Sequence, residues 1–295
     1  MTPMSILHMT SEPSGQPPVL IHAFAGFLDA GAAGRIAVAH MVDALEHRKL
    51  GEFDIDLLYD YRGRRPRSTF LSDHYGDIDL PELVLYELTD SHGQNFLALQ
   101  GPEPDLGWRA VRDAVISLVQ RWDVALVLGL QGVPFPAPHT RAVQVTAHGT
   151  DSSLIAGREP WVGDIEVPGS MSGLLELSLA AAGRTSLGFV AHVPHYLAAA
   201  DYPSAAVRLI EELSATTGLA IPLDDLRERA AEADADISRQ VAADPENVQV
   251  VQALEEQLDG MLAARAAEKG EPSASVPSDE EIAAQVERFL AELDR

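Results

Sequence analysis

The sequence predicts an α/β protein with three layers, in which a mostly parallel sheet carries helices on both faces and an acidic helical extension follows. Apolar runs of strand length alternate with helical patterns from residue 18 to residue 222, and parallel neighbours in a sheet need such crossover connections. Beyond residue 222, apolar residues recur only at helical spacings of three and four. We therefore expect a flexible tail over residues 1–17, an α/β domain over 18–222 and a helical extension over 223–295.

In the first half of the domain, strands are expected over residues 18–24, 53–59 and 83–88. The helix expected over residues 30–49 begins with small residues, among them Gly31 and Gly34, which let it start close against the sheet. Asp29 precedes this helix and is well placed to accept hydrogen bonds from its free amide groups. Residues 90–104 are rich in Gly and Pro and are expected to form a loop.

In the second half, helices are expected over residues 105–121, 170–182 and 203–216, the second of them capped by Ser170 or Ser172. The strands between them are expected over residues 124–130, 142–147 and 187–193. The first of these is a nearly continuous apolar run, which is typical of a strand covered on both faces.

The C-terminal extension reads as three amphipathic helices, with a flexible linker over residues 270–278 before the last one. Residues 223–295 contain 19 acidic and 7 basic residues, so their net charge of −12 is half of the total of −24. Two interpretations stay open: a solvated appendage, or a clamp around a neighbouring subunit or another partner.

Composition excludes several classes of function. A net charge of −24 opposes binding to nucleic acid or to an anionic membrane, because both are polyanions. The sequence has no cysteine, so disulfides and thiolate chemistry are ruled out. We see neither a signal peptide nor an apolar run of the roughly 20 residues that a membrane helix needs. A cytoplasmic protein is expected.

Polar side chains follow the predicted strands and should meet at one edge of the sheet, where open α/β sheets bind ligands. Five histidines lie in such loops, and each could act as an acid, a base or a binding group, or could simply hydrogen-bond the backbone. They are His92, His139, His148, His192 and His195. The candidate binding residues are Asp29, His139, Arg141, His148, His192, His195 and Tyr196. If the protein is an enzyme, the catalytic candidates are His192, His195, Tyr196, His139 and Asp151.

No motif that we tested identifies an enzyme, a cofactor site or a metal site. Gly26, Gly31 and Gly34 do not form the glycine pattern of a nucleotide-binding loop. The segment 169–173 has methionine where a nucleophile elbow needs its serine. Pro194 separates His192 from His195, so the two do not share a helix face as zinc ligands do. We expect no cofactor and no metal.

Four arginines, Arg62, Arg64, Arg65 and Arg67, form a basic island in this acidic chain. They lie in a predicted loop that contains Gly63 and Pro66. A plain surface loop is one interpretation. A second is a subunit interface, because guanidinium groups suit bidentate contacts with carboxylates. Nucleic-acid binding is the third and least favoured.

Several short stretches together resemble the proteasome assembly chaperone 2 family, in its actinobacterial branch. They are residues 25–31, residues 101–105 with Trp108, residues 138–141 with 145–148, and residues 192–197 with Tyr202 and Pro203. The resemblance implies a fold like that of the phosphorylase and hydrolase group, and homo-oligomers, with a trimer favoured. It also implies members that mostly lack an assigned activity, and eukaryotic members that help to build the proteasome. The chain ends Leu293-Asp294-Arg295, without the tyrosine of tails that dock into the proteasome ring, so docking by the tail is not expected.

Two hypotheses about function follow. The first is a non-catalytic, oligomeric protein-binding module whose expected partners are other copies of itself, with proteasome subunits as candidate partners. The second is an enzyme or small-molecule binder that uses the loops at the carboxyl ends of the strands.

Overall fold

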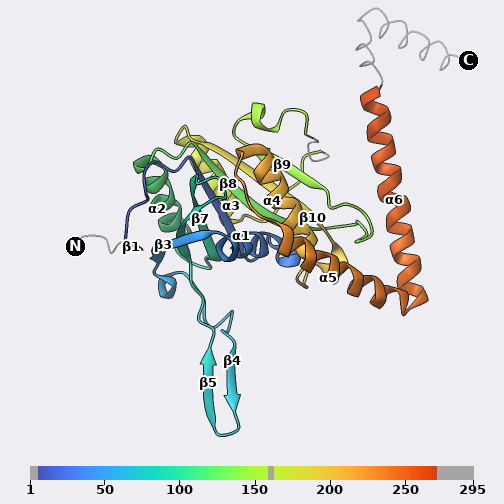
Figure 1. Cartoon of the computed structure of the whole chain (residues 1–295), viewed down its shortest axis with the longest axis horizontal. Helices are drawn as coiled ribbons and strands as arrows, with labels where there is room; N and C mark the ends of the chain where they lie inside the picture. The colour runs from blue at the N-terminus through green and yellow to red at the C-terminus, as the bar shows by residue number, and fades with distance from the viewer. Residues whose placement is uncertain (1–5, 159–162, 271–295) are drawn as a thin grey trace, which may run out of the picture.

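A mixed eight-stranded sheet forms the centre of the molecule (Figure 1). The structure is a computed structural model that describes residues 6–158 and 163–270, with side chains described as far as residue 265. In sheet order the strands are β1 (Leu7–Met9), β3 (Glu46–Phe53), β6 (Val84–Thr89), β7 (Asn95–Pro102), β2 (Val19–Ala25), β8 (Leu126–Phe135), β10 (Thr185–Pro194) and β9 (Val145–Gly149).

The four central strands β7, β2, β8 and β10 are parallel, and the outer strands pair antiparallel with their neighbours. Since β3 is antiparallel to β6, which is antiparallel to β7, five of these eight strands run in one direction. Helices α1 (Ala33–Ala44) and α4 (Pro203–Thr217) cover one face of the sheet. Helices α2 (Trp108–Arg121) and α3 (Met171–Ala181) cover the other. The three-layer α/β prediction is confirmed.

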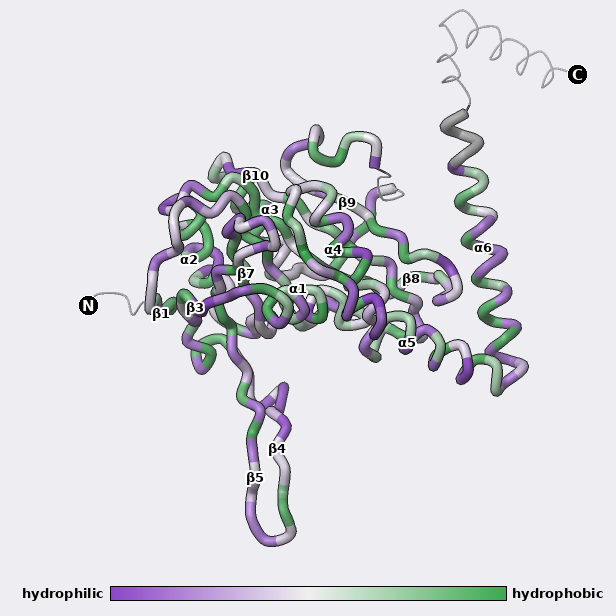
Figure 2. The backbone as a smooth tube through the Cα atoms, viewed as in Figure 1, coloured by the Kyte–Doolittle hydropathy of each residue, from purple (hydrophilic) through white to green (hydrophobic). Residues whose placement is uncertain are grey.

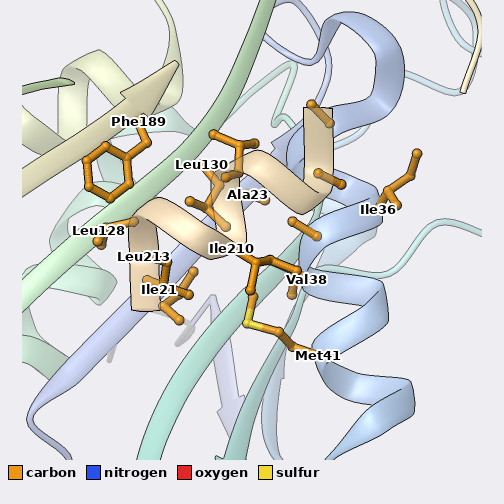
Figure 3. Packing of buried hydrophobic residues seen from close by; sticks show 14 of the residues in the cluster. Ile21, Ala23, Ile36, Val38, Met41, Leu128, Leu130, Phe189, Ile210 and Leu213 are labelled. Carbon is orange, nitrogen blue, oxygen red and sulfur yellow. The ribbon is translucent and has the colours of Figure 1, made fainter. Parts of the chain in front are cut away.

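The alternation of side chains along each strand supplies a separate core to each face. Ile21, Leu128 and Phe189 point to the α1–α4 side, where they meet Met41 and Ile210 (Figure 3). Leu20, Val127 and their counterparts point to the α2–α3 side. Figure 2 shows that hydrophobic residues concentrate in these central elements. The central strands are therefore apolar on both faces, as the sequence of β8 indicates.

Helix α1 lies unusually close to the sheet at its first turn. A Cβ atom at Gly34 would stand 2.4 Å from the backbone oxygen of Leu130 in β8, and Ala33 beside it is fully buried. This contact confirms the prediction that small residues let the helix start against the sheet.

Two predicted elements of the first half are wrong. A strand was expected over residues 53–59, but the observed strand β3 covers Glu46–Phe53. The residues after it form a 3-10 turn at Ile55–Leu57. The helix expected to reach residue 49 ends at Ala44. Residues 46–49 are polar and mostly exposed, so they show little apolar periodicity, and their pairing with β6 makes them a strand.

The loop expected over residues 90–104 contains the central strand β7. Its four buried residues, 96–99, form a short apolar run between polar and glycine-rich flanks, and those flanks dominate the sequence signal. Near the N-terminus, Leu7–Met9 pairs with Gly51–Phe53, in a segment that was expected to be flexible.

A two-stranded hairpin, β4 (Ser68–Leu71) and β5 (His74–Ile78), projects away from the body between the turn η2 (Ile55–Leu57) and β6 (Figure 1). The sequence analysis predicted no strand there. We call residues 62–80 the arm, so that it includes the arginine island at its base.

Two of the three predicted C-terminal helices are present, as α5 (Asp224–Ala242) and α6 (Pro245–Gly270). Gly270 is the last residue of α6. The rest of the predicted linker and the predicted third helix lie outside the described residues.

We predict that Gly34→Ala destabilises the protein by about 1–3 kcal/mol, because the added methyl group pushes α1 away from the Leu130 carbonyl. The measurement is the urea midpoint of unfolding. Gly260→Ala is the matched control, since no atom lies within 4 Å of the added methyl group in α6. That control should leave stability unchanged or raise it slightly. Equal midpoints for Gly34→Ala and the parent would contradict the close contact.

Candidate functional site at the carboxyl edge of the sheet

The carboxyl ends of β8 and β10 bring several predicted residues together. His139 and Arg141 lie in the β8–β9 loop, and Tyr196 lies in the turn η4 (His195–Leu197) that follows β10. The Tyr196 hydroxyl accepts from the backbone amide of His139 at 2.8 Å and lies 2.8 Å from its Nδ1 atom. His195 is exposed beside them, with its ring 5.5 Å from that of Tyr196. Sequence reasoning placed these four residues together correctly.

The C-terminal helices cover this cluster. His139 Nε2 lies 3.2 Å from Ser238 Oγ in α5. Arg141 makes a bidentate contact with Asp259 in α6, at 3.0 and 2.8 Å, and a second ion pair with Glu255 at 3.2 Å. Thr140 also donates to Glu255. The polar groups that could have faced a substrate thus face the protein's own extension.

Burial lowers the pKa of His139, so its ring is neutral at pH 7. A neutral ring whose Nδ1 accepts from the Tyr196 hydroxyl can donate from Nε2 to Ser238. Burial is also the main reason that the pKa of Tyr196 is raised. The His139–Tyr196 pair therefore connects the core to the C-terminal helices by hydrogen bonds.

His192 is held inside the same edge. Its Nε2 atom lies 2.9 Å from Thr146 Oγ1 in β9, and its ring stacks on Phe135 with centroids 4.3 Å apart. Burial first, and the nearby charge of Arg265 second, lower its pKa to about 4. His192 is thus a neutral packing residue of the edge at pH 7.

Asp29 caps α1, as the sequence predicts. Its Oδ1 atom accepts from the backbone amides of Gly34 at 2.9 Å and Arg35 at 3.3 Å. Burial outweighs these hydrogen bonds and raises the pKa of Asp29 to about 6. The Arg35 side chain turns away and pairs with Asp201 at 2.6 Å. The carboxylate occupies the helix N-terminus, which leaves no place there for a bound anion.

Two candidate residues lie elsewhere, because β9 is antiparallel to β10 rather than parallel as expected. The chain after β9 therefore runs toward the amino end of β10. His148 pairs in register with Gly188 and contacts Glu176 of α3 at 2.6 Å. Asp151 caps the turn η3 (Ser152–Ile155), accepting from Ser153, and these hydrogen bonds lower its pKa. The expectation that these two join the edge cluster is wrong.

His92, the fifth loop histidine, follows β6 rather than a central strand. It sits in the tight turn between β6 and β7, where its backbone amide donates to Asp90 at 2.9 Å. It is likewise not part of the edge cluster.

The sequence analysis missed the buried His22 and the half-buried Asp234. His22 lies inside β2 and is 3% exposed, and its Nδ1 atom has no hydrogen-bond partner in the described part of the chain. Burial, and then the charge of His148, lower its pKa to about 4. Asp234 of α5 accepts from Ser204 at 2.7 Å, and burial raises its pKa. A lone histidine within an apolar strand is the only sequence signal for the first, and nothing local signals the second.

The arginine island divides in two. Arg64 is used within its own subunit: it pairs with Asp105 at 2.7 Å, donates to the Glu103 carbonyl at 2.6 Å and stacks over Tyr59 at 4.4 Å. The side chains of Arg62, Arg65 and Arg67 make no ion pair with any described residue. The subunit-interface interpretation stays a prediction for these three.

Two further findings limit the chemistry of the described residues. Across residues 6–158 and 163–270, no group of three or more metal-ligating side chains comes together. Over the same ranges, no helix is both long and apolar enough to cross a membrane.

A model of the PAC2 family matches residues 23–241, which is most of the chain and contains the edge cluster and the sheet from the end of β2 onward. The chain belongs to the PAC2 family. This confirms the resemblance to proteasome assembly chaperone 2 that the short motifs indicate. No curated protein sequence matches the chain.

Solved PAC2-like structures agree with the fold. The Mycobacterium tuberculosis protein of unknown function Rv2714 is 44% identical, with a TM-score of 0.86 over 90% of this chain and 92% of its own. A Corynebacterium glutamicum protein of unknown function is 34% identical, with a TM-score of 0.81 over 88% and 98%. The M. tuberculosis proteasome-assembly chaperone homologue Rv2125 is 25% identical, with a TM-score of 0.71 over 79% and 99%. This PAC2 protein thus shares its fold with proteins of unknown function and with a chaperone homologue.

We predict that His22 makes the protein less stable as the pH falls. Its pKa is about 4 when folded and 6.5 when unfolded, so the unfolded state binds the proton first and stability is lost between about pH 6.5 and pH 4. The loss should approach roughly 3 kcal/mol, at 1.36 kcal/mol per pKa unit. Asp29, whose pKa is raised, contributes with the opposite sign between about pH 6 and pH 4.

The measurement for His22 is urea unfolding of the parent and of His22→Gln at several pH values. The difference between the two isolates His22, and it should shrink as the pH falls. His8→Gln, at an exposed histidine, is the control and should follow the parent. A constant difference across this pH range would contradict the prediction.

We predict that Arg141→Glu loosens α6 without unfolding the domain, because it turns attraction to Asp259 and Glu255 into repulsion. Hydrogen exchange of residues 245–265 should become faster, while exchange in β8 and β10 stays unchanged. Adding Asp259→Arg and Glu255→Arg to Arg141→Glu should restore part of the protection. Unchanged exchange in α6 would show that these ion pairs do not hold it.

Proposed function

We propose that this PAC2 protein is a non-catalytic, homo-oligomeric protein-binding module of the cytoplasm, with a proteasome-related partner. The observation that carries the proposal is the arm. Its described strands are exposed along their whole length, yet it presents large apolar side chains to solvent. They are Phe70, Leu71, Tyr75, Ile78 and Leu80, each between 48% and 76% exposed.

An isolated two-stranded hairpin is marginally stable in water unless something covers it. The arm is anchored to the body at its base, where Arg64 contacts Asp105 and Glu103. Projecting apolar side chains of this kind mark protein-interaction sites. The arm therefore favours a partner protein, and the first partner always present is a second copy of the chain.

The carboxyl edge of the sheet supports the same conclusion. His139 and Arg141 bind the C-terminal helices, and His192 is packed inside. A catalytic site needs groups directed at a substrate, whereas these are directed at the chain itself. The relative described as a proteasome-assembly chaperone homologue supports a proteasome-related partner beyond the protein's own copies.

A small-molecule binder is the second candidate, and one observation favours it. Asp234 Oδ1 is buried without a hydrogen-bond partner among the described residues, and Asp234 interacts electrostatically with His139. Such a group could receive a polar ligand. A thermal-shift screen of nucleosides, phosphates and small carboxylates tests this, with Asp234→Asn and the His192→Ala/His195→Ala double variant compared with the parent.

We predict that Phe70→Ser/Tyr75→Ser converts the oligomer into monomers, because it removes the aromatic pair of the arm. Light scattering coupled to size exclusion measures the mass. Leu177→Ser is the control, since it removes an equally exposed apolar side chain from α3. A parent protein that is monomeric at micromolar concentration would overturn the homo-oligomer.

The partner itself requires native co-purification followed by mass spectrometry. Proteasome subunits should be retained by the parent and absent from a mock purification. Retention of no other protein would limit the module to self-association.

A further inference from the structure

The arm is apolar on both of its faces. Phe70 and Tyr75 face each other across the ladder, with ring centroids 5.2 Å apart. Leu71 lies on the opposite face, where it covers Gly76. A surface that receives this ribbon must therefore be apolar. It must also be acidic near the arm's base, where Arg62, Arg65 and Arg67 have no ion pair among the described residues.

The elbow between α5 and α6 has both properties. A groove of about 260 Å³ opens there, against the turn η4. Its apolar lining consists of Leu197, Ile237, Val241, Val250 and Val251. Val250 is 50% exposed, so the groove is incompletely covered by its own subunit.

The two helices supply the complementary charge. Residues 224–259 contain eleven acidic and three basic residues, a net charge of −8. Asp236 already pairs with Arg239, whereas Asp244 and Glu246 flank the elbow without a basic partner among the described residues. Guanidinium groups of the arm suit such carboxylates.

In this structure the arm does not lie in its own groove, whose lining contains no residue of the arm. It leaves the body beside β6, whereas the groove lies at the end of β10, four strands away in the sheet. Four strand spacings amount to about 19 Å. Figure 1 also shows the arm pointing away from the body and the elbow lying on a different side. The arm and the groove therefore do not meet within this subunit, and a second copy can bring them together.

We propose that the arm of one protomer docks in the α5–α6 groove of the next. This inference rests on the proposed homo-oligomer and names the surface that receives the arm. Because the arm and the groove are different surfaces, the contact between copies is head-to-tail. Such contacts form a ring when the rotation that relates one protomer to the next closes on itself. A closed ring of any number of subunits satisfies every arm and every groove.

The absence of cysteine from the chain makes this contact directly testable. Tyr75→Cys and Val250→Cys, on differently tagged chains, are co-expressed and treated with a short bismaleimide. The expected product is a covalent dimer that contains both tags. A chain with both substitutions should give a ladder that ends at a closed ring. Light scattering first establishes that each variant remains oligomeric.

Tyr75→Cys with Leu177→Cys is the matched control, because Leu177 is 73% exposed on α3, away from the groove, and should give no cross-link. An oligomer without a Tyr75–Val250 cross-link would overturn the docking site while leaving the proposed function intact. Monomeric parent protein would overturn both. Equal cross-linking to Leu177 and to Val250 would also reject a specific groove.

Discussion

The parallel pairing of β2, β8 and β10 is the constraint on which the rest of the molecule depends. Ten residues of β8 pair in register with ten of β10, and β2 joins the other side of β8. Because both faces of these strands are buried, side chains of the two cores come from alternate residues of the same segments. The pairing also fixes one edge at which β8 and β10 end together, and so places His139 beside Tyr196.

At that edge, the chain uses its polar groups to attach its own extension. The acidic residues of α5 and α6 repel one another, yet a few of them meet Arg141, Thr140 and Ser204 on the domain. Three apolar residues of α6, Val251, Leu254 and Leu258, are buried as well. The attachment thus combines a small apolar contact with ion pairs near the surface. For α6, contacts of that kind hold the helix in place without making it part of the core, whereas Leu226 of α5 is a fully buried member of the α1–α4 core.

Charge and exposure are compatible with the proposed contact between copies of this acidic PAC2 protein. Most of its surface repels other copies, since the net charge is −24. The arm concentrates free arginines and exposed apolar side chains in one projecting segment, and the acidic helices lie elsewhere. Because the basic, apolar arm and the acidic helices are separate on one chain, a specific contact between the two surfaces is favoured over general aggregation.

The sequence by itself determined the α/β class and the four buried strands β2, β6, β8 and β10, which carry long apolar runs or clear alternation. It also determined the caps at Asp29 and Ser170 and the close contact of α1 with the sheet at Gly34. Each is a local property, in which periodicity or a side-chain hydrogen bond acts within a few residues. Short motifs also identified the family. The histidines near His192 could be placed because parallel strands end together.

Tertiary structure alone decided the rest. Strand β3 is polar, and its form depends on hydrogen bonds to β6, which no local pattern records. The direction of β9 depends on its pairing with β10. Because that pairing is antiparallel, His148 and Asp151 lie away from the carboxyl edge of the sheet. The covering of His139 and Arg141 joins residues about 100 positions apart, so only the folded chain brings them together. Sequence periodicity shows which side of an element is apolar, but long-range pairing determines what that side contacts.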